Sequence, residues 1–148
     1  KVISGLRRSG KSTLLKLFRE ELEKSGVEKS QIISLNFEEF ELRRFQNNLD
    51  ELYDYIIEHL DLSRPNYVFL DEIQNVNEFE RLVDGLFVKP NIDVYITGSN
   101  ALLLSGELAT LLGGRYVEIS ILPFSFKEYI EARKFDFGLD AEAFNSKL

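Results

Sequence analysis

Short apolar runs alternate along the chain with segments in which apolar residues recur every three or four positions. The runs have the length of strands and the other segments have the period of helices, an alternation typical of parallel βαβ units. The apolar runs predict strands at residues 1–4, 31–37, 66–71, 92–97 and 115–122. The periodic segments predict helices at residues 11–24, 49–60, 77–87, 101–112 and 125–133. The pattern therefore predicts an α/β fold.

The side chains of each strand predict its place in the sheet. The strands at 66–71 and 92–97 are apolar on both faces, as strands covered by helices on each side must be. Glu118 and Ser120 interrupt the last strand, and the strand at 31–37 also carries polar residues, so both are expected at the edges. Right-handed crossovers then favour a three-layer αβα fold whose parallel five-stranded sheet has the order 5-1-4-3-2.

The connection between the first strand and the first helix reads Gly-Leu-Arg-Arg-Ser-Gly-Lys-Ser at residues 5–12. It fits the spacing of a phosphate-binding P-loop, in which backbone N–H groups surround an anion at the start of a helix. Lys11 is expected to reach the β- and γ-phosphates of a nucleotide, and the Ser12 hydroxyl is expected to ligate Mg²⁺. The residues expected to contact the nucleotide are Gly5, Ser9, Gly10, Lys11, Ser12 and Thr13. The predicted fold is therefore that of a P-loop NTPase.

Two adjacent carboxylates, Asp71 and Glu72, end the apolar run of the third strand. Ligands of open α/β sheets gather at the carboxyl ends of the strands, which is also where the P-loop lies. We expect Asp71 to hold Mg²⁺ through water, and Glu72 to orient the water that attacks the γ-phosphate. A loop that binds a triphosphate and a strand that delivers two acids to the same edge together predict a nucleotide-hydrolysing site.

The segment Thr-Gly-Ser-Asn at residues 97–100 closes the fourth strand, between the P-loop strand and the acid-bearing strand of the predicted sheet. A polar side chain there could contact both the γ-phosphate and the attacking water. Ser99 and Asn100 are the candidates for this sensing role, with Thr97 as the third. The alternative for Asn100 is an N-cap of the helix expected at 101–112, and one residue could serve both purposes.

Two further polar residues have a functional and an ordinary interpretation. Asn36 ends the strand beside the acid pair and could hydrogen-bond Glu72, holding it away from water until the second strand changes; edge-strand polarity explains it equally well. Arg115 follows two glycines and could neutralise charge on the transferred phosphoryl group, in its own chain or in a neighbouring subunit. Arginine at the start of a strand also occurs without any such role.

Other polar positions are expected to be solvated. Arg7 and Arg8 lie inside the P-loop motif and are expected to point outward, where they could face a neighbouring subunit. His59, near the end of the second helix, is expected to be a surface residue or a partner of the helix dipole. The polar stretch at 38–48 is expected to be an exposed connection.

Composition limits the remaining functions. The chain has 148 residues, enough for one ordinary core, and its net charge of -7 would repel a phosphodiester backbone, so direct binding of nucleic acid is not expected. It has no cysteine and no apolar stretch long enough to span a bilayer, which fits a cytoplasmic protein. Because the chain starts without methionine four residues before the P-loop, we interpret it as a piece of a longer protein. The expected division is an ATPase domain at 1–135, with a shortened first strand, and the beginning of a C-terminal region at 136–148.

These motifs together resemble an AAA+ ATPase domain of the additional-strand P-loop class. The sequences at 5–12, 69–74, 96–100, 113–115 and 122–129 resemble, more narrowly, a prokaryotic family of uncharacterised ATPases in which an N-terminal AAA domain precedes a separate C-terminal domain. The resemblance implies that Gly10, Lys11 and Ser12 bind phosphate and Mg²⁺ and that Asp71 and Glu72 serve metal and water. It also implies that Ser99 or Asn100 senses the phosphate and that Arg115 is the arginine contact.

The sequence therefore predicts an ATPase that uses ATP and Mg²⁺ and couples hydrolysis to a conformational change in a larger protein. A small-molecule kinase shares the P-loop, but no arginine-rich lid separates the fourth and fifth strands. A third alternative is a nucleotide-dependent interaction switch with little turnover, and a GTPase is disfavoured because no Asn-Lys-x-Asp motif is present. The expected partners are the nucleotide, a protein bound through the C-terminal region and, if Arg115 acts between subunits, a second copy of the chain.

Overall fold

A parallel sheet of five strands forms the centre of the protein, as the computed structural model shows for the residues it describes, 1–98 and 113–137. The strands are β1 (Val2–Gly5), β2 (Ile32–Asn36), β3 (Asn66–Asp71), β4 (Ile92–Thr97) and β5 (Glu118–Ile121). Their order is β2-β3-β4-β1-β5, and every neighbouring pair is parallel. The predicted order 5-1-4-3-2 is confirmed, including both edge strands.

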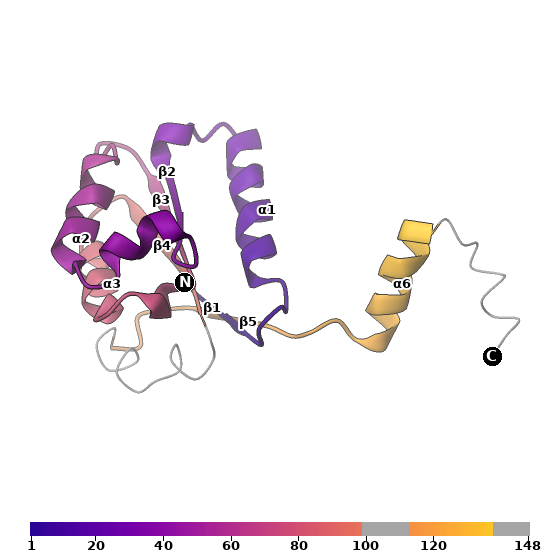
Figure 1. Ribbon diagram of the computed structural model, residues 1–148. Coiled ribbons are helices and arrows are strands. Elements are labelled where there is room, and N and C mark those ends of the chain that lie inside the picture. The colour runs from indigo at the N-terminus through magenta and orange to yellow at the C-terminus, as the bar shows by residue number, and fades with distance from the viewer. Residues whose placement is uncertain (99–112, 138–148) are drawn as a thin grey trace, which may run out of the picture.

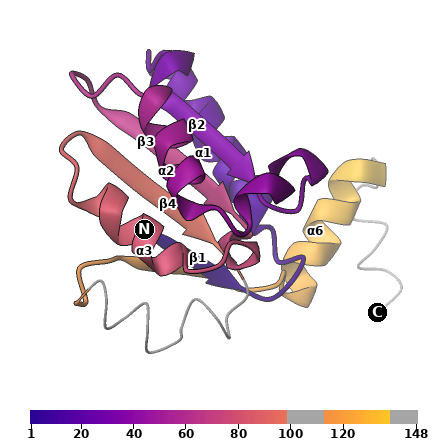
Figure 2. The same cartoon turned by 60° about the vertical axis from the view of Figure 1, so that its left-hand side comes forward.

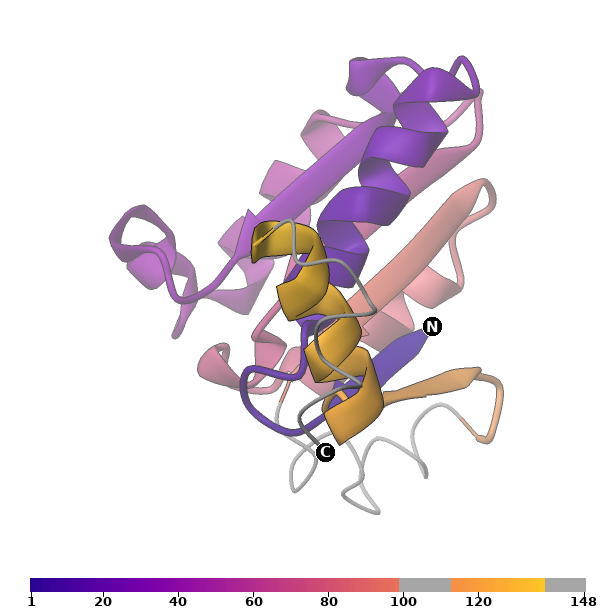
Figure 3. The same cartoon turned by 90° about the vertical axis from the view of Figure 1, so that its right-hand side faces the viewer.

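Helices cover both faces of this sheet. The described helices are α1 (Lys11–Lys24), α2 (Leu49–Glu58), α3 (Phe79–Phe87) and α6 (Phe126–Phe137), with short 3₁₀ turns η1 (Lys29–Gln31), η2 (Phe40–Phe45) and η3 (Ile73–Asn75). Helix α1 lies on one side of the strands, and α2 and α3 lie on the other (Figure 1). Figure 2 shows α2 and α3 in front of the sheet, and Figure 3 shows α1 in front of it. The three-layer arrangement is therefore confirmed, while the helix expected at 101–112 lies outside the described residues.

Alternating side chains of the central strands build two separate cores. Val68 and Leu70 of β3 pack toward α2 and α3, where they join a large buried cluster. Phe69 points to the opposite face and packs with Phe18 of α1 and Tyr95 of β4, with ring centroids 5.0 to 6.0 Å apart. Because β3 buries both faces, it must lie inside the sheet, which is the arrangement that its unbroken apolar sequence predicts.

The α1 side of the sheet is the more open one. Leu14 and Leu17 of α1 belong to the apolar face expected from the sequence, but both are exposed. An apolar groove lined by Leu14, Phe18, Val117 and Ile119, among others, runs between α1 and β5. Strand β5 is exposed on both faces for most of its length, in keeping with its place at the edge of the sheet. Helix α6 lies beyond this side of the sheet, at the end of the segment that follows β5 (Figure 3).

The stretch at 38–48 is more structured than a solvated loop. It contains η2, and Phe45 within it is fully buried against the α2–α3 core. Most other side chains of the stretch are exposed, as expected. The expectation of a plain exposed connection is therefore wrong at Phe45, because one aromatic side chain among polar neighbours is enough to anchor a loop to the core.

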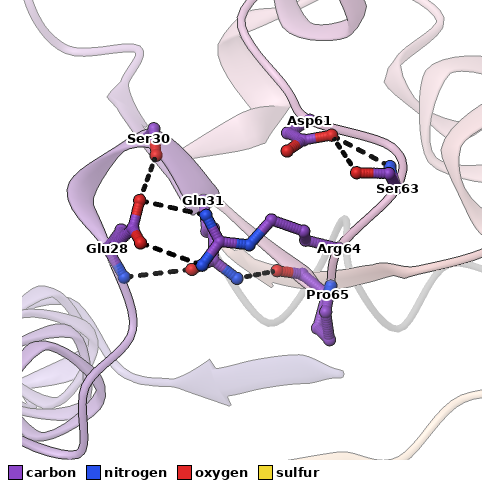
Figure 4. A network of polar contacts seen from close by, with 7 residues as sticks. All are labelled: Glu28, Ser30, Gln31, Asp61, Ser63, Arg64 and Pro65. Atoms are coloured by element: carbon purple, nitrogen blue, oxygen red, sulfur yellow. Dashed lines mark hydrogen bonds and ion pairs between the residues drawn. The ribbon is translucent and has the colours of Figure 1, made fainter.

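A polar network fixes the spacing of β2 and β3 near their amino ends (Figure 4). The Arg64 guanidinium donates to both carboxylate oxygens of Glu28, at 2.9 and 3.0 Å. Gln31 accepts from the Glu28 N–H at 3.1 Å and donates to the Pro65 carbonyl at 2.7 Å. These bonds join the segment before β2 to the segment before β3. The neighbouring guanidinium of Arg64 also lowers the pKa of the Glu28 carboxyl below its ordinary value.

The Glu28–Arg64 pair gives a pH-dependent prediction for stability. Because the pKa of Glu28 is lower in the folded than in the unfolded protein, the pair stabilises the fold above the ordinary carboxyl pKa, and this contribution is lost as the pH falls through the lowered value. The substitution Arg64→Met should lower the urea midpoint near neutral pH. The difference from the wild type should shrink as the pH falls from about 6 toward 3.

The matched control is Arg81→Met, which removes an exposed ion pair with Glu78 inside a single turn. Its effect on the urea midpoint should be the smaller one, because Arg81 and Glu78 are only three residues apart and link no separate segments. A wild-type midpoint for Arg64→Met at neutral pH, or a difference that persists unchanged in acid, would show that the pair does not act in this way.

Candidate functional site

The loop between β1 and α1 leads into the first turn of a helix, where backbone N–H groups have no partner within the helix. The loop turns through Arg8 and Gly10, which both have left-handed backbones with φ of 65° and 99°. Its turn is closed by a bond from the Ser9 N–H to the Leu6 carbonyl at 3.1 Å. Gly10 is the N-cap of α1 and has no side chain with which to cap the helix. The first N–H groups, which have no partner within the helix, and the positive end of its dipole therefore suit an anion.

Close packing against the end of β5 requires a glycine at position 5. A Cβ at this position would lie 2.5 Å from the Ile121 carbonyl oxygen at the end of β5 and 2.7 Å from the Ser9 hydroxyl. A Cβ at Gly10 would meet nothing within 4 Å, so there only the left-handed backbone favours glycine. Both expected glycines are thus needed, but Gly5 for close packing within the protein and Gly10 for its conformation.

The ammonium group of Lys11 is buried without a counter-ion among the described residues. The residue is only 5% exposed, and its Nζ donates to the carbonyls of Gly5 and Leu6 at 3.1 and 3.0 Å. The Ser9 hydroxyl beside the loop is also buried, with no hydrogen-bond partner in the described part of the chain. A buried charge is normally paired, and an ammonium can donate three hydrogen bonds. Lys11, Ser9 and the helix donors therefore suit an anionic ligand such as a phosphate.

The acid pair is organised by Thr97 at the end of β4. The register pairs Leu70 with Ile96, which brings the next residues, Asp71 and Thr97, side by side. The fully buried Thr97 hydroxyl donates to the carboxylate of Asp71 and accepts the Glu72 N–H at 3.0 Å. One hydroxyl thus holds both acids, a role that the sequence alone did not identify. The predicted strand order already places the end of β4 beside the end of β3, so a contact between Thr97 and the two acids could have been predicted from it.

Glu72 has an unusual backbone and a side-chain partner different from the expected one. Its φ and ψ are 53° and 45°, a left-handed conformation that is uncommon outside glycine and often occurs at functional sites. Its carboxylate accepts a hydrogen bond from the Gln74 amide at 2.5 Å. The expected bond from Asn36 is not formed; the Asn36 side chain instead accepts the N–H of Glu38 through its Oδ1 at 3.1 Å, in its own turn.

The P-loop and the acid strand meet in one cavity of about 320 Å³. Its lining brings together a lysine and an arginine of the loop with acidic and amide groups from β2 onward: Arg7, Lys11, Glu38, Glu72, Gln74 and Asn75. The described residues contain no cluster of three or more acids and histidines that could bind a metal alone. The two metal ligands expected from the sequence are Ser12, which is exposed in the first turn of α1, and Asp71, which is buried; neither is among the residues that line the cavity. Such a small set suits Mg²⁺, which usually keeps several waters.

The structure does not bring Arg115 to this cavity. It precedes β5 and therefore lies at the amino end of the sheet, where its guanidinium sits 5.0 Å from the ring centroid of Phe87. The P-loop follows the paired strand β1 at the opposite end, so the length of a strand, more than about 10 Å, separates them. Of the two alternatives left open by the sequence, this position contradicts contact with a phosphate bound by the same chain.

The remaining candidates are ordinary or lie outside the described residues. Ser99 and Asn100 fall in the latter group. Thr13 is exposed in the first turn of α1, and Arg8 is exposed in the loop. His59 is an exposed residue at the end of α2, where its ring nitrogen is 2.7 Å from the Tyr55 carbonyl, in agreement with the expected surface role.

The double contact of Thr97 gives a testable prediction. In Thr97→Val the Glu72 N–H and the Asp71 carboxylate both lose their partner, which should lower the free energy of unfolding by about 2–3 kcal/mol. Thr97→Ser keeps the hydroxyl and removes only a methyl group, with an expected loss of about 1 kcal/mol. Hydrogen exchange at the Glu72 amide should accelerate in the valine variant and stay slow in the serine variant. Equal protection in the two variants would contradict the assigned contact.

Comparison with known proteins places the chain in a family. A family model described as an AAA domain matches residues 1–130. An uncharacterised protein of Haemophilus influenzae is 50% identical over 137 residues, which are 92% of this chain and 34% of that protein. An uncharacterised protein of Methanocaldococcus jannaschii is 35% identical over 137 residues, 92% of this chain and 29% of that protein. The chain thus spans about a third of the length of these two relatives.

A solved structure shares the fold. A chain in the structure of Drosophila ORC bound to AT-rich DNA and Cdc6 aligns with 98% of this chain and 59% of its own length, with a TM-score of 0.51 and 13% identity. At that identity the likeness concerns the fold alone. Within the described segments, no helix is both long and apolar enough to cross a membrane. The match of the family model over most of the sequence, together with a P-loop beside an acid-bearing strand, shows that the chain belongs to the AAA domain family, ATP-binding domains of the P-loop class.

Proposed function

We propose that this domain hydrolyses ATP to ADP and phosphate with Mg²⁺. The observation that carries the proposal is the buried Lys11 ammonium, which has no carboxylate partner in residues 1–98 and 113–137 and lines the same cavity as Glu72. The cation suits the phosphates of a nucleotide, and the acid suits a water molecule beside them. Membership of the AAA domain family supports binding of ATP.

Each candidate site residue named here has a defined part in this proposal. Lys11 and the free N–H groups at the start of α1 bind the phosphates, and the Ser9 hydroxyl gains the partner that it lacks. Ser12 and Asp71 hold Mg²⁺, which when bound neutralises charge on the phosphate oxygens. Thr97 donates to Asp71 and so leaves the other carboxylate lone pairs available as ligands.

Glu72 is the proposed general base. Its carboxylate lines the cavity next to Lys11, and its backbone is fixed by the Thr97 hydroxyl. A carboxylate in this position accepts a proton from water as the oxygen attacks phosphorus. The same geometry would serve a kinase if an acceptor hydroxyl replaced water, so the product decides between the two reactions: free phosphate for the ATPase and a phosphorylated acceptor for the kinase.

We propose that Arg115 contacts a phosphate bound by a neighbouring subunit. We also propose that hydrolysis in this domain is coupled to the rest of the protein. Because Arg115 lies at the far end of the sheet from its own P-loop, a phosphate that it contacts must belong to a neighbouring copy. This chain spans about a third of its two relatives, which supports coupling of hydrolysis to a conformational change elsewhere in a longer protein. A nucleotide-dependent switch with little turnover is the alternative. The net charge of -7 argues against direct binding of nucleic acid by this domain.

The first test concerns binding. Lys11→Ala removes the buried cation, so the affinity for ATP measured by calorimetric titration should fall by about a hundredfold. Lys16→Ala changes an exposed lysine of the same helix and should leave the affinity unchanged. An unaltered ATP affinity in the Lys11 variant would remove the proposed phosphate site.

The second test concerns turnover. Glu72→Gln keeps the shape of the side chain and removes the base, so release of phosphate should fall by about 10² to 10⁴-fold while ATP still binds. Glu58→Gln, an exposed glutamate at the end of α2, is the matched control and should keep full turnover. Turnover at the wild-type rate in the Glu72 variant would show that this carboxylate is not the base.

A further inference from the structure

Gln74 lies beside the proposed base at the cavity, and although it ends the motif at residues 69–74, that motif assigns it no role. It lies in η3, the turn that directly follows Glu72, and both residues line the cavity beside Lys11. Its Nε2 donates to Oε2 of Glu72 at 2.5 Å. A carboxylate can only accept, so the amide must turn its nitrogen toward Glu72. This orientation decides where the other end of the amide lies.

The other end of the Gln74 amide is left without a partner. Its Oε1 is buried and accepts no hydrogen bond from any described residue. Buried polar atoms are nearly always paired, and exceptions call for an explanation in strain or function. A glutamine that served the fold alone would be expected to satisfy both ends. Gln74 satisfies only the end that touches the proposed base.

The two contacts of Glu72 hold it from both sides. The Thr97 hydroxyl fixes its backbone N–H in the left-handed conformation, and the Gln74 amide fixes one oxygen of its carboxylate. A free glutamate side chain has three rotatable bonds, and anchoring one oxygen removes most of that freedom. The second oxygen, Oε1 of Glu72, accepts no hydrogen bond from the described part of the chain, which leaves its lone pairs for a water molecule.

We propose that Gln74 is a positioning residue for the hydrolysis of ATP, acting through Glu72. It orients the Glu72 carboxylate at the cavity by a charge-assisted hydrogen bond, and the protein tolerates its unpartnered Oε1 for that purpose. The inference depends on the proposed function, because it assigns Gln74 to the base of that reaction. It predicts that a change at Gln74 lowers turnover but leaves nucleotide binding and the stability of the fold unchanged.

The experiment uses the full-length protein carrying Gln74→Met, which keeps the length of the side chain and removes both polar atoms. The maximal rate of phosphate release should fall by about tenfold or more, because the base loses its orientation. The KM for ATP should stay within about twofold of the wild-type value, since the phosphates keep their contacts. The urea midpoint should stay the same or rise, because the variant removes a buried atom without a partner.

Two comparisons make the result specific. Gln46→Met makes the same chemical change in a glutamine at the end of η2 that does not line the cavity, and it should leave turnover unchanged. In the double variant with Glu72→Gln, the substitution at Gln74 should cause little further loss, because Gln74 acts only through that carboxylate. A full second loss in the double variant would overturn the proposal.

The remaining outcomes are also decisive. Wild-type turnover in Gln74→Met, or faster turnover, would overturn the positioning role, and so would a loss of turnover that follows a lowered urea midpoint. If Glu72→Gln abolishes phosphate release while Gln74→Met retains it, only the inference on Gln74 fails. If Glu72→Gln itself retains phosphate release, the proposed function fails first.

Discussion

The parallel pairing of β4 with β3 on one side and with β1 on the other is the constraint on which the candidate site depends. It brings the carboxyl ends of the three strands to one edge, so that the loop after β1, the acids after β3 and Thr97 of β4 lie together. A slip of one residue between β3 and β4 would turn Thr97 to the opposite face of the sheet. Both of its hydrogen bonds, to Asp71 and to the Glu72 N–H, would then be lost.

The site combines charges that the overall composition does not reveal. The chain is acidic as a whole, yet the cavity is bounded on one side by a buried cation and by free helix N–H groups. Local donors act at short range in a medium of low polarity, whereas the net charge acts at long range and is screened by salt. An anionic ligand is therefore selected by the few groups that touch it, in spite of the repulsive field of the surface.

Much of the architecture could be predicted because the relevant signals are contiguous in the sequence. The unbroken apolar runs of β3 and β4 identify central strands, and the spacing from Gly5 to Ser12 identifies the loop. The bounds of α1, β3 and β4 agree with the prediction. The elements β2, β5, α2 and α3 are shorter than predicted, β1 is shifted by one residue, and α6 ends later than predicted. Local patterns thus predict where elements lie, and less well where they end.

The contacts inside the site depend on turn geometry, which no periodic pattern encodes. The left-handed backbone of Glu72 puts its carboxylate next to Gln74, while Asn36 closes a turn of its own. The position of Arg115 was within reach of sequence reasoning, since a residue before a parallel strand lies opposite the P-loop end. Roles for Ser99 and Asn100, and the domain boundary at 135, stay predictions.

The contact between Gly5 and the Ile121 carbonyl has a mechanical consequence. There is no room for even one methyl group between the first residue of the loop and the last residue of β5, so neither can approach the other without a shift of its strand. The chain continues from Ile121 through a short extended segment into α6. A displacement of β5 toward the loop would therefore act on the backbone of Gly5 directly, through this one contact.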